Sequence, residues 1–239
     1  MAQKTTPLVS VVIPVYNEEK ILVPAVKTLV EQLNGLGYDY EIIIAENGSK
    51  DRTVELAHEL EAEHPNVRLL RSPQPDYGYA LRLGIIEARG KYVICDEIDL
   101  GIMDFYRNAL KNLMEDRADM VVGSKVLAES KDDRPAMRRV ATRVINGMLR
   151  IGVGFKGTDT HGLKSFNRER ILPVVHKCML GKDLFASELV IRAERGGLRV
   201  MEIPLHLHEI RPPSIHLMRR VPRVLKDMGY LVYLIRFKG

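Results

Sequence analysis

The sequence is poor in the residues that mark several large classes of protein. Its 239 residues include two cysteines, five phenylalanines and no tryptophan. Because Cys95 and Cys178 do not make a disulfide framework, a reducing compartment such as the cytoplasm is the expected location. The histidines have no zinc-ligand spacing and the few aromatic residues form no RNA-binding signature, so a nucleic-acid partner is not expected.

Long apolar segments are also missing. The sequence has no run of about 18 apolar residues, so no membrane-spanning helix is expected. The first seven residues lack the apolar core of a signal peptide. The formal net charge of +5 suits an anionic partner, such as a nucleotide, a phosphorylated lipid or an acidic membrane surface. We therefore expect a cytoplasmic protein, with peripheral contact to the cytoplasmic face of a membrane as a hypothesis.

Three acidic residues follow a short apolar run, residues 92–95, that predicts a buried strand. They are Asp96, Glu97 and Asp99. At the carboxyl end of a central strand in an α/β sheet, these carboxylates would lie at the mouth of the usual ligand crevice. Carboxylates this close repel one another, and a hard divalent cation that also binds phosphates would relieve the repulsion. A solvated acidic turn is the alternative.

Short β-branched runs alternate with segments of helical periodicity along the first half of the chain. The pattern predicts strands over residues 8–15, 40–45, 67–70, 92–95 and 120–123, and helices over 20–33, 54–60, 78–88 and 105–115. In the less regular second half it predicts helices over 140–151, 182–195 and from 217 onward, and a strand over 200–205. The alternation is typical of an α/β fold with a mostly parallel central sheet flanked by helices. No repeat or linker divides the chain, so one domain is expected.

The first two strand-to-helix turns carry groups that can bind a nucleotide. Tyr16 offers a ring face, and the carboxylates of Glu18 and Glu46 can accept hydrogen bonds from a base or a ribose. Gly48 permits the backbone to approach a ligand closely. Ordinary turn chemistry and helix capping are the alternative for both turns.

Four segments carry a resemblance to a known family. They are residues 12–18 (VIPVYNE), 47–53 (NGSKDRT), 78–90 (GYALRLGIIEARG) and 159–166 (DTHGLKSF). Together they resemble the family 2 glycosyltransferases of GT-A fold, in particular the branch of dolichyl-phosphate mannose synthases and dolichyl-phosphate glucosyltransferases. The resemblance implies a single GT-A (nucleotide-diphospho-sugar transferase) domain over 1–239. Its parts would be a nucleotide-binding half (8–125), an acceptor half (126–215) and a C-terminal amphipathic basic helix (216–239).

The resemblance also implies roles for individual residues. Donor contacts are expected from Pro14, Tyr16, Glu18, Ile44, Glu46, Glu97, Ile98, Asp99, Lys125 and Arg211. Glu97 and Asp99 fall on the family's metal-binding Asp-x-Asp motif and would hold Mg²⁺ or Mn²⁺. Asp96, just before the motif, would either support these ligands from behind or be a further ligand. Gly101 stands where the family has a polar side chain near the metal.

The implied reaction moves a hexose from a GDP- or UDP-sugar to a polyprenyl phosphate, with inversion at the anomeric carbon. Metal and fixed cations would neutralise the leaving diphosphate. A lipid phosphate is already anionic near neutral pH and needs positive guidance instead of deprotonation. The candidates for that guidance are Arg138, Arg139, Arg143 and Lys164.

Two alternative functions, and two placements of the basic segments, remain open at this point. Transfer to a sugar hydroxyl of a polysaccharide or glycolipid would need a general base, for which Asp159 and Glu188 are the candidates. The altered metal motif also suits a scaffold that binds nucleotide sugars and has lost turnover. Basic residues 137–143 and the C-terminal helix are predicted either to lie on an anionic membrane or to pack on the sheet with a solvated basic face.

Overall fold

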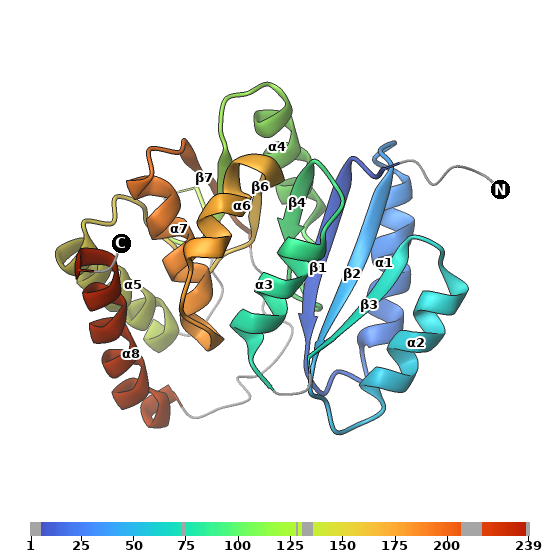
Figure 1. Cartoon of the computed structure of the whole chain (residues 1–239), viewed down its shortest axis with the longest axis horizontal. Helices are drawn as coiled ribbons and strands as arrows, with labels where there is room; N and C mark the ends of the chain where they lie inside the picture. Colours follow the sequence, from blue (N-terminus) through green and yellow to red (C-terminus); the bar gives the residue numbers. More distant parts are fainter. Residues whose placement is uncertain (1–5, 73–74, 128, 131–135, 207–216, 238–239) are drawn as a thin grey trace.

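The structure, a computed structural model, confirms the α/β fold. It describes residues 6–72, 75–127, 129–130, 136–206 and 217–237. Within these ranges a seven-stranded sheet has the order β3-β2-β1-β4-β6-β5-β7 (Figure 1). The strands are β1 (Val9–Val15), β2 (Tyr40–Asn47), β3 (Val67–Ser72), β4 (Tyr92–Cys95), β5 (Met120–Ser124), β6 (Lys164–Asn167) and β7 (Val200–Pro204). Neighbouring strands are parallel except at β6, which runs antiparallel to β4 and β5.

Helices connect most of the strands. They are α1 (Leu22–Asn34), α2 (Thr53–Glu63), α3 (Tyr77–Glu87), α4 (Met103–Met114), α5 (Ala136–Val153), α6 (Arg168–Lys177), α7 (Phe185–Arg195) and α8 (Leu217–Phe237). A 3₁₀ turn, η1 (Lys182–Leu184), leads into α7. In the described part of the chain, none of the helices is both long enough and apolar enough to cross a membrane.

Sequence periodicity did not predict β6 and α6. In β6, KSFN, Phe166 is the one large apolar residue, and α6 contains Pro173, which interrupts a helical pattern. Phe166 pairs with Val93 of β4 on one side and with Met120 of β5 on the other. Pairing on both sides, rather than local propensity, therefore makes this segment a strand.

Alternate strand residues point to opposite faces of the sheet and build two cores. On one face, Val12, Ile43 and Val93 pack with residues of α3, α5, α6, α7 and α8. On the other face, Val11 and Ile42 pack with residues of α1, α2 and α4. Figure 1 shows α1 and α2 at the right and α5, α7 and α8 at the left. Because helices cover both faces, the open crevice of the sheet lies at the strand ends.

Two glycines allow close approaches that shape these strand ends. A Cβ at Gly84 would overlap the side chain of Val12, so α3 packs directly on β1. A Cβ at Gly162 would overlap the carbonyl of Gly123, near the end of β5. The Gly123 amide also donates a hydrogen bond to the Leu163 carbonyl at 2.8 Å. The loop of residues 159–163 is therefore pressed against β5.

Candidate active site

A cavity of about 530 Å³ opens at the carboxyl ends of β1, β2, β4 and β5. Its polar side is lined by Glu18, Asn47, Glu97, Asp99, Lys125 and Lys164. Its apolar side is lined by Tyr77, Leu81, Ile145, Leu184 and Ala186. A larger hollow of about 1030 Å³ lies at the amino ends of the strands, beside Leu8, Asp39 and Lys91. That hollow contains none of the donor or metal residues named from the sequence, so the smaller cavity is the candidate site.

Two turns at one end of the cavity are joined by hydrogen bonds from the backbone of one turn to side chains of the other. Asn17 adopts a left-handed backbone conformation with φ of 55°. Its amide donates to Ser49 Oγ at 2.9 Å, and the next amide, of Glu18, donates to Thr53 Oγ1 at 2.8 Å. These bonds hold the turn after β1 against the turn after β2, which brings both into the wall of one cavity.

The structure separates the donor residues expected from these turns into two groups. Those that line the cavity are Pro14, Tyr16 and Glu18. Ile44 does not, because it is fully buried in the core with α1 and α2. Glu46 does not either: it is 1% exposed, and its carboxylate accepts from the Ser49 amide at 2.5 Å and lies 3.8 Å from Arg71 Nε. Its neighbour Asn47 lines the cavity instead, a contact that the sequence pattern did not single out.

The acidic segment after β4 supplies three carboxylates to the cavity lining, and Asp96 is the most buried of them. Asp96 is 3% exposed; its Oδ2 accepts from the Tyr106 hydroxyl at 2.6 Å and its Oδ1 accepts from the Glu97 amide at 2.7 Å. Burial raises the pKa of Asp96 to about 7, although these donors favour the ionised form. The Tyr106 hydroxyl and the Glu97 amide occupy both oxygens of Asp96, which agrees with its expected place behind the metal ligands. Glu97 and Asp99 are therefore the principal candidate ligands, and a direct role for Asp96 stays a prediction.

The residues present fit a hard divalent ion that shares its coordination with a substrate. In the described part of the chain, no group of three or more His, Cys, Asp or Glu residues could hold a metal by itself. Glu97 and Asp99 nevertheless lie in one cavity, with Ile98 between them. Mg²⁺ and Mn²⁺ are usually bound through one or two carboxylates plus phosphate oxygens and water. The donor set therefore suits a metal that arrives with a diphosphate.

Asp159 lies behind the cavity wall. It is fully buried; its Oδ1 accepts from the His161 amide at 2.8 Å and its Oδ2 accepts from the Lys125 amide at 3.3 Å. Lys125 Nζ is 3.9 Å from the same Oδ2. Burial alone would raise the pKa of Asp159, but Lys125 and the His161 amide outweigh burial and lower it. Asp159 is therefore an ionised anchor for Lys125 and for the loop, and is not placed as the general base proposed from the sequence.

Lys164 lines the cavity from β6 although it was proposed from the sequence together with the arginines of α5. It is 3% exposed, and its Nζ donates to the Gly162 carbonyl at 2.8 Å. Burial lowers the pKa of Lys164 from 10.5 to about 8, although Asp159 and Glu97 favour the charged form. A buried ammonium group in the wall of a cavity is a strong site for an anionic ligand, because little water screens it.

Glu188 is not at the cavity. It is fully buried on α7, where its Oε1 accepts from Arg192 Nε at 2.7 Å. Its Oε2 accepts from the amides of Met179 at 2.9 Å and Leu180 at 2.7 Å. This placement does not agree with the role of general base considered for Glu188 from the sequence. Its carboxylate fixes the segment before η1 through these two amides. The 3₁₀ turn η1 then places Leu184 in the cavity lining.

The remaining cations named from the sequence fall into two groups. Arg143 is exposed on α5 and does not line the cavity. The side chains of Arg138 and Arg139, and all of Arg211, lie outside the described residues. The sequence also gave no sign that Ile145 of α5 and Asp227 of α8 would line the same cavity as the strand-end motifs, because both come from helices far along the chain.

The fold and the cavity together define a GT-A nucleotide-diphospho-sugar transferase architecture. Residues 10–178 match the family model described as Glycosyl transferase family 2. That match covers more than half of the chain, so the protein belongs to glycosyltransferase family 2.

Two curated relatives illustrate the similarity. The chain is 32% identical over 217 residues to "Dolichyl-phosphate beta-glucosyltransferase ALG5D" of Trichomonas vaginalis, with 84% of this chain and 66% of that protein covered. It is 30% identical over 218 residues to "Glycosyltransferase AglD" of Haloferax volcanii, with 89% of this chain and 35% of that protein covered. The chain thus spans between about a third and two thirds of the length of these relatives.

Two solved structures share the fold at low sequence identity. Glucosyl-3-phosphoglycerate synthase from Mycobacterium tuberculosis in complex with UDP has a TM-score of 0.65 at 18% identity, covering 95% of this chain and 80% of that chain. The mannosyltransferase PcManGT from Pyrobaculum calidifontis in complex with GDP-Man and Mn²⁺ has a TM-score of 0.61 at 19% identity, covering 99% of this chain and 66% of that chain.

Proposed function

We propose that this protein transfers a hexose from a nucleoside diphosphate sugar to a polyprenyl phosphate, with inversion at the anomeric carbon. The observation that carries the proposal is the composition of the cavity: Glu97 and Asp99 share it with Lys125, Lys164 and an apolar wall. The carboxylate pair suits a metal-bound diphosphate, the lysines suit a phosphate, and the apolar wall suits a prenyl chain. The dolichyl-phosphate relative supports the acceptor, and the structures with UDP and GDP-Man support the donor class.

On the donor side, Glu97 and Asp99 would hold Mg²⁺ or Mn²⁺, which would neutralise the charge on the departing diphosphate. Tyr16, Glu18 and Asn47 would bind the nucleoside. Lys125 would add a fixed cation, oriented by Asp159 behind it at 3.9 Å. GDP and UDP both remain candidates for the nucleotide.

On the acceptor side, a phosphate suits this cavity better than a sugar hydroxyl does. A phosphate monoester is ionised at neutral pH because its second pKa is about 6, so it can attack without a general base. Asp159 and Glu188, the bases expected for a hydroxyl acceptor, do not line the cavity. Lys164, with a pKa of about 8, carries a positive charge at neutral pH and would hold the acceptor phosphate.

A polyprenyl acceptor implies work at a membrane surface, and we assign the reaction to the cytoplasmic face. The free thiols support this assignment, because Cys95 and Cys178 are both buried and unpaired with each other, as in proteins of a reducing compartment.

A transfer assay with organic extraction tests the function. Purified protein is incubated with radiolabelled GDP- and UDP-hexoses, a polyprenyl phosphate in detergent, and Mg²⁺, Mn²⁺ or EDTA. The expected result is label in the organic phase for one donor, dependent on the divalent ion. Label transferred instead to a soluble oligosaccharide would favour the hydroxyl acceptor. Calorimetric binding of GDP or UDP without transfer to any acceptor would favour the scaffold.

A further inference from the structure

Helix α5 carries an apolar stripe on its outer side. Val140, Val144, Met148 and Ile151 recur at intervals of three or four residues, which places them on one side of the helix. Their exposed fractions are 56%, 55%, 37% and 84%. The opposite side of α5 buries Leu149. The described residues therefore cover the outer stripe only in part, although its side chains are as apolar as those of the core.

Helix α8 carries a second, aromatic stripe. Tyr230, Tyr233 and Phe237 are 50%, 46% and 75% exposed. Their rings form a ladder, with centroids 6.3 Å apart for the two tyrosines and 5.7 Å apart for Tyr233 and Phe237. The two tyrosines combine an apolar ring with a polar hydroxyl, which suits a boundary between water and hydrocarbon, and Phe237 adds apolar area.

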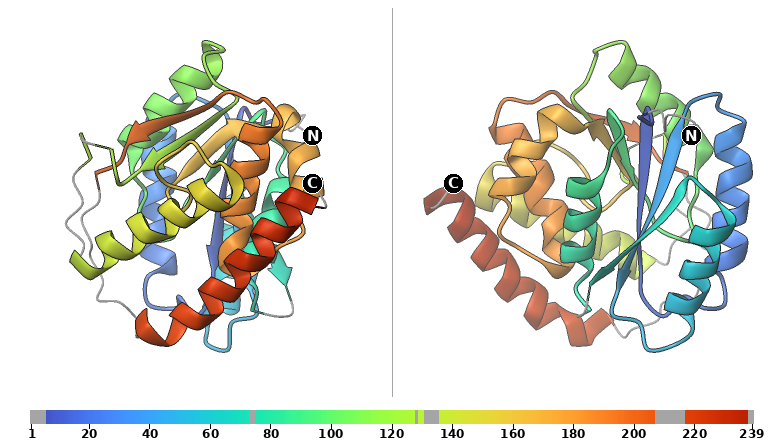
Figure 2. Two further views of the ribbon diagram at one scale, coloured as in Figure 1. Left: turned by 90° about the vertical axis from the view of Figure 1, so that its left-hand side faces the viewer. Right: turned by 45° about the vertical axis from the view of Figure 1, so that its right-hand side comes forward.

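The two stripes lie on neighbouring helices (Figure 2). Arg236 Nε of α8 donates to the Gly152 carbonyl of α5 at 2.6 Å, and a Cβ at Gly152 would overlap Val232 of α8. The inner sides of both helices bury residues in the same core, Leu149 and Val153 from α5 with Met228, Leu231 and Ile235 from α8. Their outer sides therefore form one continuous surface, which we call the α5–α8 face.

Positive charge is concentrated on the same two helices. The segments of α5 and α8 contain nine lysines and arginines and one acidic residue, Asp227. The whole chain contains 36 basic and 31 acidic residues. The rest of the chain, with 27 basic and 30 acidic residues, is therefore net negative. Arg143, Arg150, Lys226 and Arg236 are exposed on these helices. Asp227 lines the cavity.

We propose that the α5–α8 face docks on an anionic lipid bilayer, with its apolar and aromatic side chains in the interface and its cations among the headgroups. Charge complementarity favours a bilayer over a second copy of the chain, because two copies of a cationic face repel each other. The proposal extends the proposed function, because Ile145 and Asp227 of the same helices line the cavity. A prenyl phosphate would then reach Lys164 from the membrane side of the protein.

Vesicle sedimentation without any donor or acceptor tests the docking separately from the transferase activity. Wild-type protein is expected to bind phosphatidylcholine vesicles containing phosphatidylserine at low salt, and to bind pure phosphatidylcholine vesicles more weakly. The Arg143→Gln, Lys226→Gln double variant should lower the binding constant about 25-fold, since each cation near an anionic surface contributes about fivefold. Arg107→Gln removes a cation from α4, where its side chain is 60% exposed, and should leave vesicle binding unchanged.

The apolar stripe is tested in the same assay. Ile151→Ser with Phe237→Ser should weaken binding to phosphatidylserine vesicles at least tenfold. Met179→Ser, a control at a 57% exposed position that belongs to neither α5 nor α8, should not weaken it. Absence of wild-type binding at low salt would overturn the proposal, as would equal losses in the control variants. A concentration-dependent dimer that Ile151→Ser abolishes, without vesicle binding, would assign the face to a second copy of the chain. Vesicle binding without sugar transfer would retain the docking surface and reject the transferase function.

Discussion

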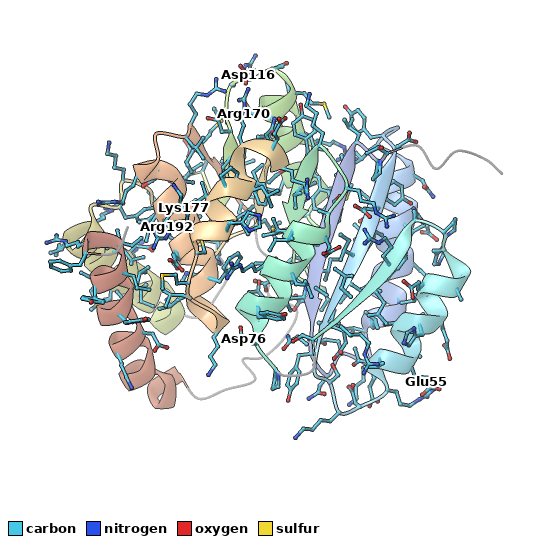
Figure 3. The ribbon with its side chains drawn as sticks, viewed as in Figure 1. Glu55, Asp76, Asp116, Arg170, Lys177 and Arg192 are labelled. Carbon is cyan, nitrogen blue, oxygen red and sulfur yellow. The ribbon has the colours of Figure 1, made fainter. Side chains whose placement is uncertain are left out.

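Replacing Glu188 by alanine is expected to destabilise the protein strongly and to leave the chemistry of the cavity intact. In the structure this carboxylate accepts from Arg192 Nε and from the amides of Met179 and Leu180. Glu188 is fully buried, and the Arg192 side chain, labelled in Figure 3, is 10% exposed. The Nη2 atom of Arg192 already lacks a hydrogen-bond partner among the described residues. Alanine would therefore leave a buried cation and two amides unpaired.

The magnitude follows from the cost of such orphaned groups. Breaking a buried ion pair by removing one partner costs about 3–5 kcal/mol, and the two amides belong to the same network, so their cost is largely included in that figure. A domain is stable by about 5–15 kcal/mol, so this is a large share of the free energy of unfolding. With a urea m-value of about 3 kcal/mol/M, the unfolding midpoint should fall by about 1–2 M.

Urea titration followed by circular dichroism measures the midpoint, and transfer rates are measured well below the unfolding transition. Glu188→Gln keeps one acceptor oxygen and the shape of the side chain, so its midpoint should lie between those of the alanine variant and the wild type. Glu55→Ala is the matched control, because this carboxylate, also labelled in Figure 3, is exposed on α2 and should leave the midpoint unchanged. An unchanged midpoint with a transfer rate lowered at least a hundredfold in both Glu188 variants would refute the structural role and restore the general base.

Three further predictions concern the cavity and its rim. Asp99→Asn should abolish the Mn²⁺-dependent part of the thermal shift with GDP or UDP. The control Asp104→Asn, at a side chain that is 82% exposed on α4, should keep that part of the shift. A retained Mn²⁺-dependent shift in Asp99→Asn would contradict the metal assignment. Because the pKa of Lys164 is about 8 in the folded protein and ordinarily 10.5, the unfolded state binds more protons between these values, so the free energy of unfolding should rise with pH across that window. Lys164→Met should lose this rise in urea titrations at the two ends of the window, and equal slopes in both proteins would exclude the buried ammonium. Gly162→Ala should lower the unfolding midpoint because its Cβ would overlap a carbonyl of β5, whereas Gly147→Ala, with open space around its Cβ, should not; equal midpoints would mean that the loop is not pressed against β5.

The α/β fold was predictable because its signals are local. The strands β1, β2 and β4 are buried on both faces, so each reads as a continuous apolar run. The flanking helices repeat their apolar residues at helical spacing. The missed elements, β6 and α6, carry little of either signal, because β6 owes its conformation to strands on both sides and α6 accommodates Pro173.

The residues at the strand ends were predictable for a similar reason. In a parallel sheet the carboxyl ends of the strands meet at one edge, so Tyr16, Glu18, Glu97 and Asp99 could be assigned to one site from their positions alone. Lys125, which follows β5, reaches the same cavity.

The sequence by itself determined six of the seven strands, the family and the edge at which the site lies, because hydrophobic periodicity and strand-end position are properties of short segments. The tertiary structure alone decided which carboxylates face the cavity. Asp159 and Glu188 are acidic residues in suggestive positions, yet each is turned toward buried amides and a cation. Asp227 reaches the cavity only because α8 packs beside α5. The direction of a side chain depends on the partners that packing brings to it, and those partners are distant in the sequence.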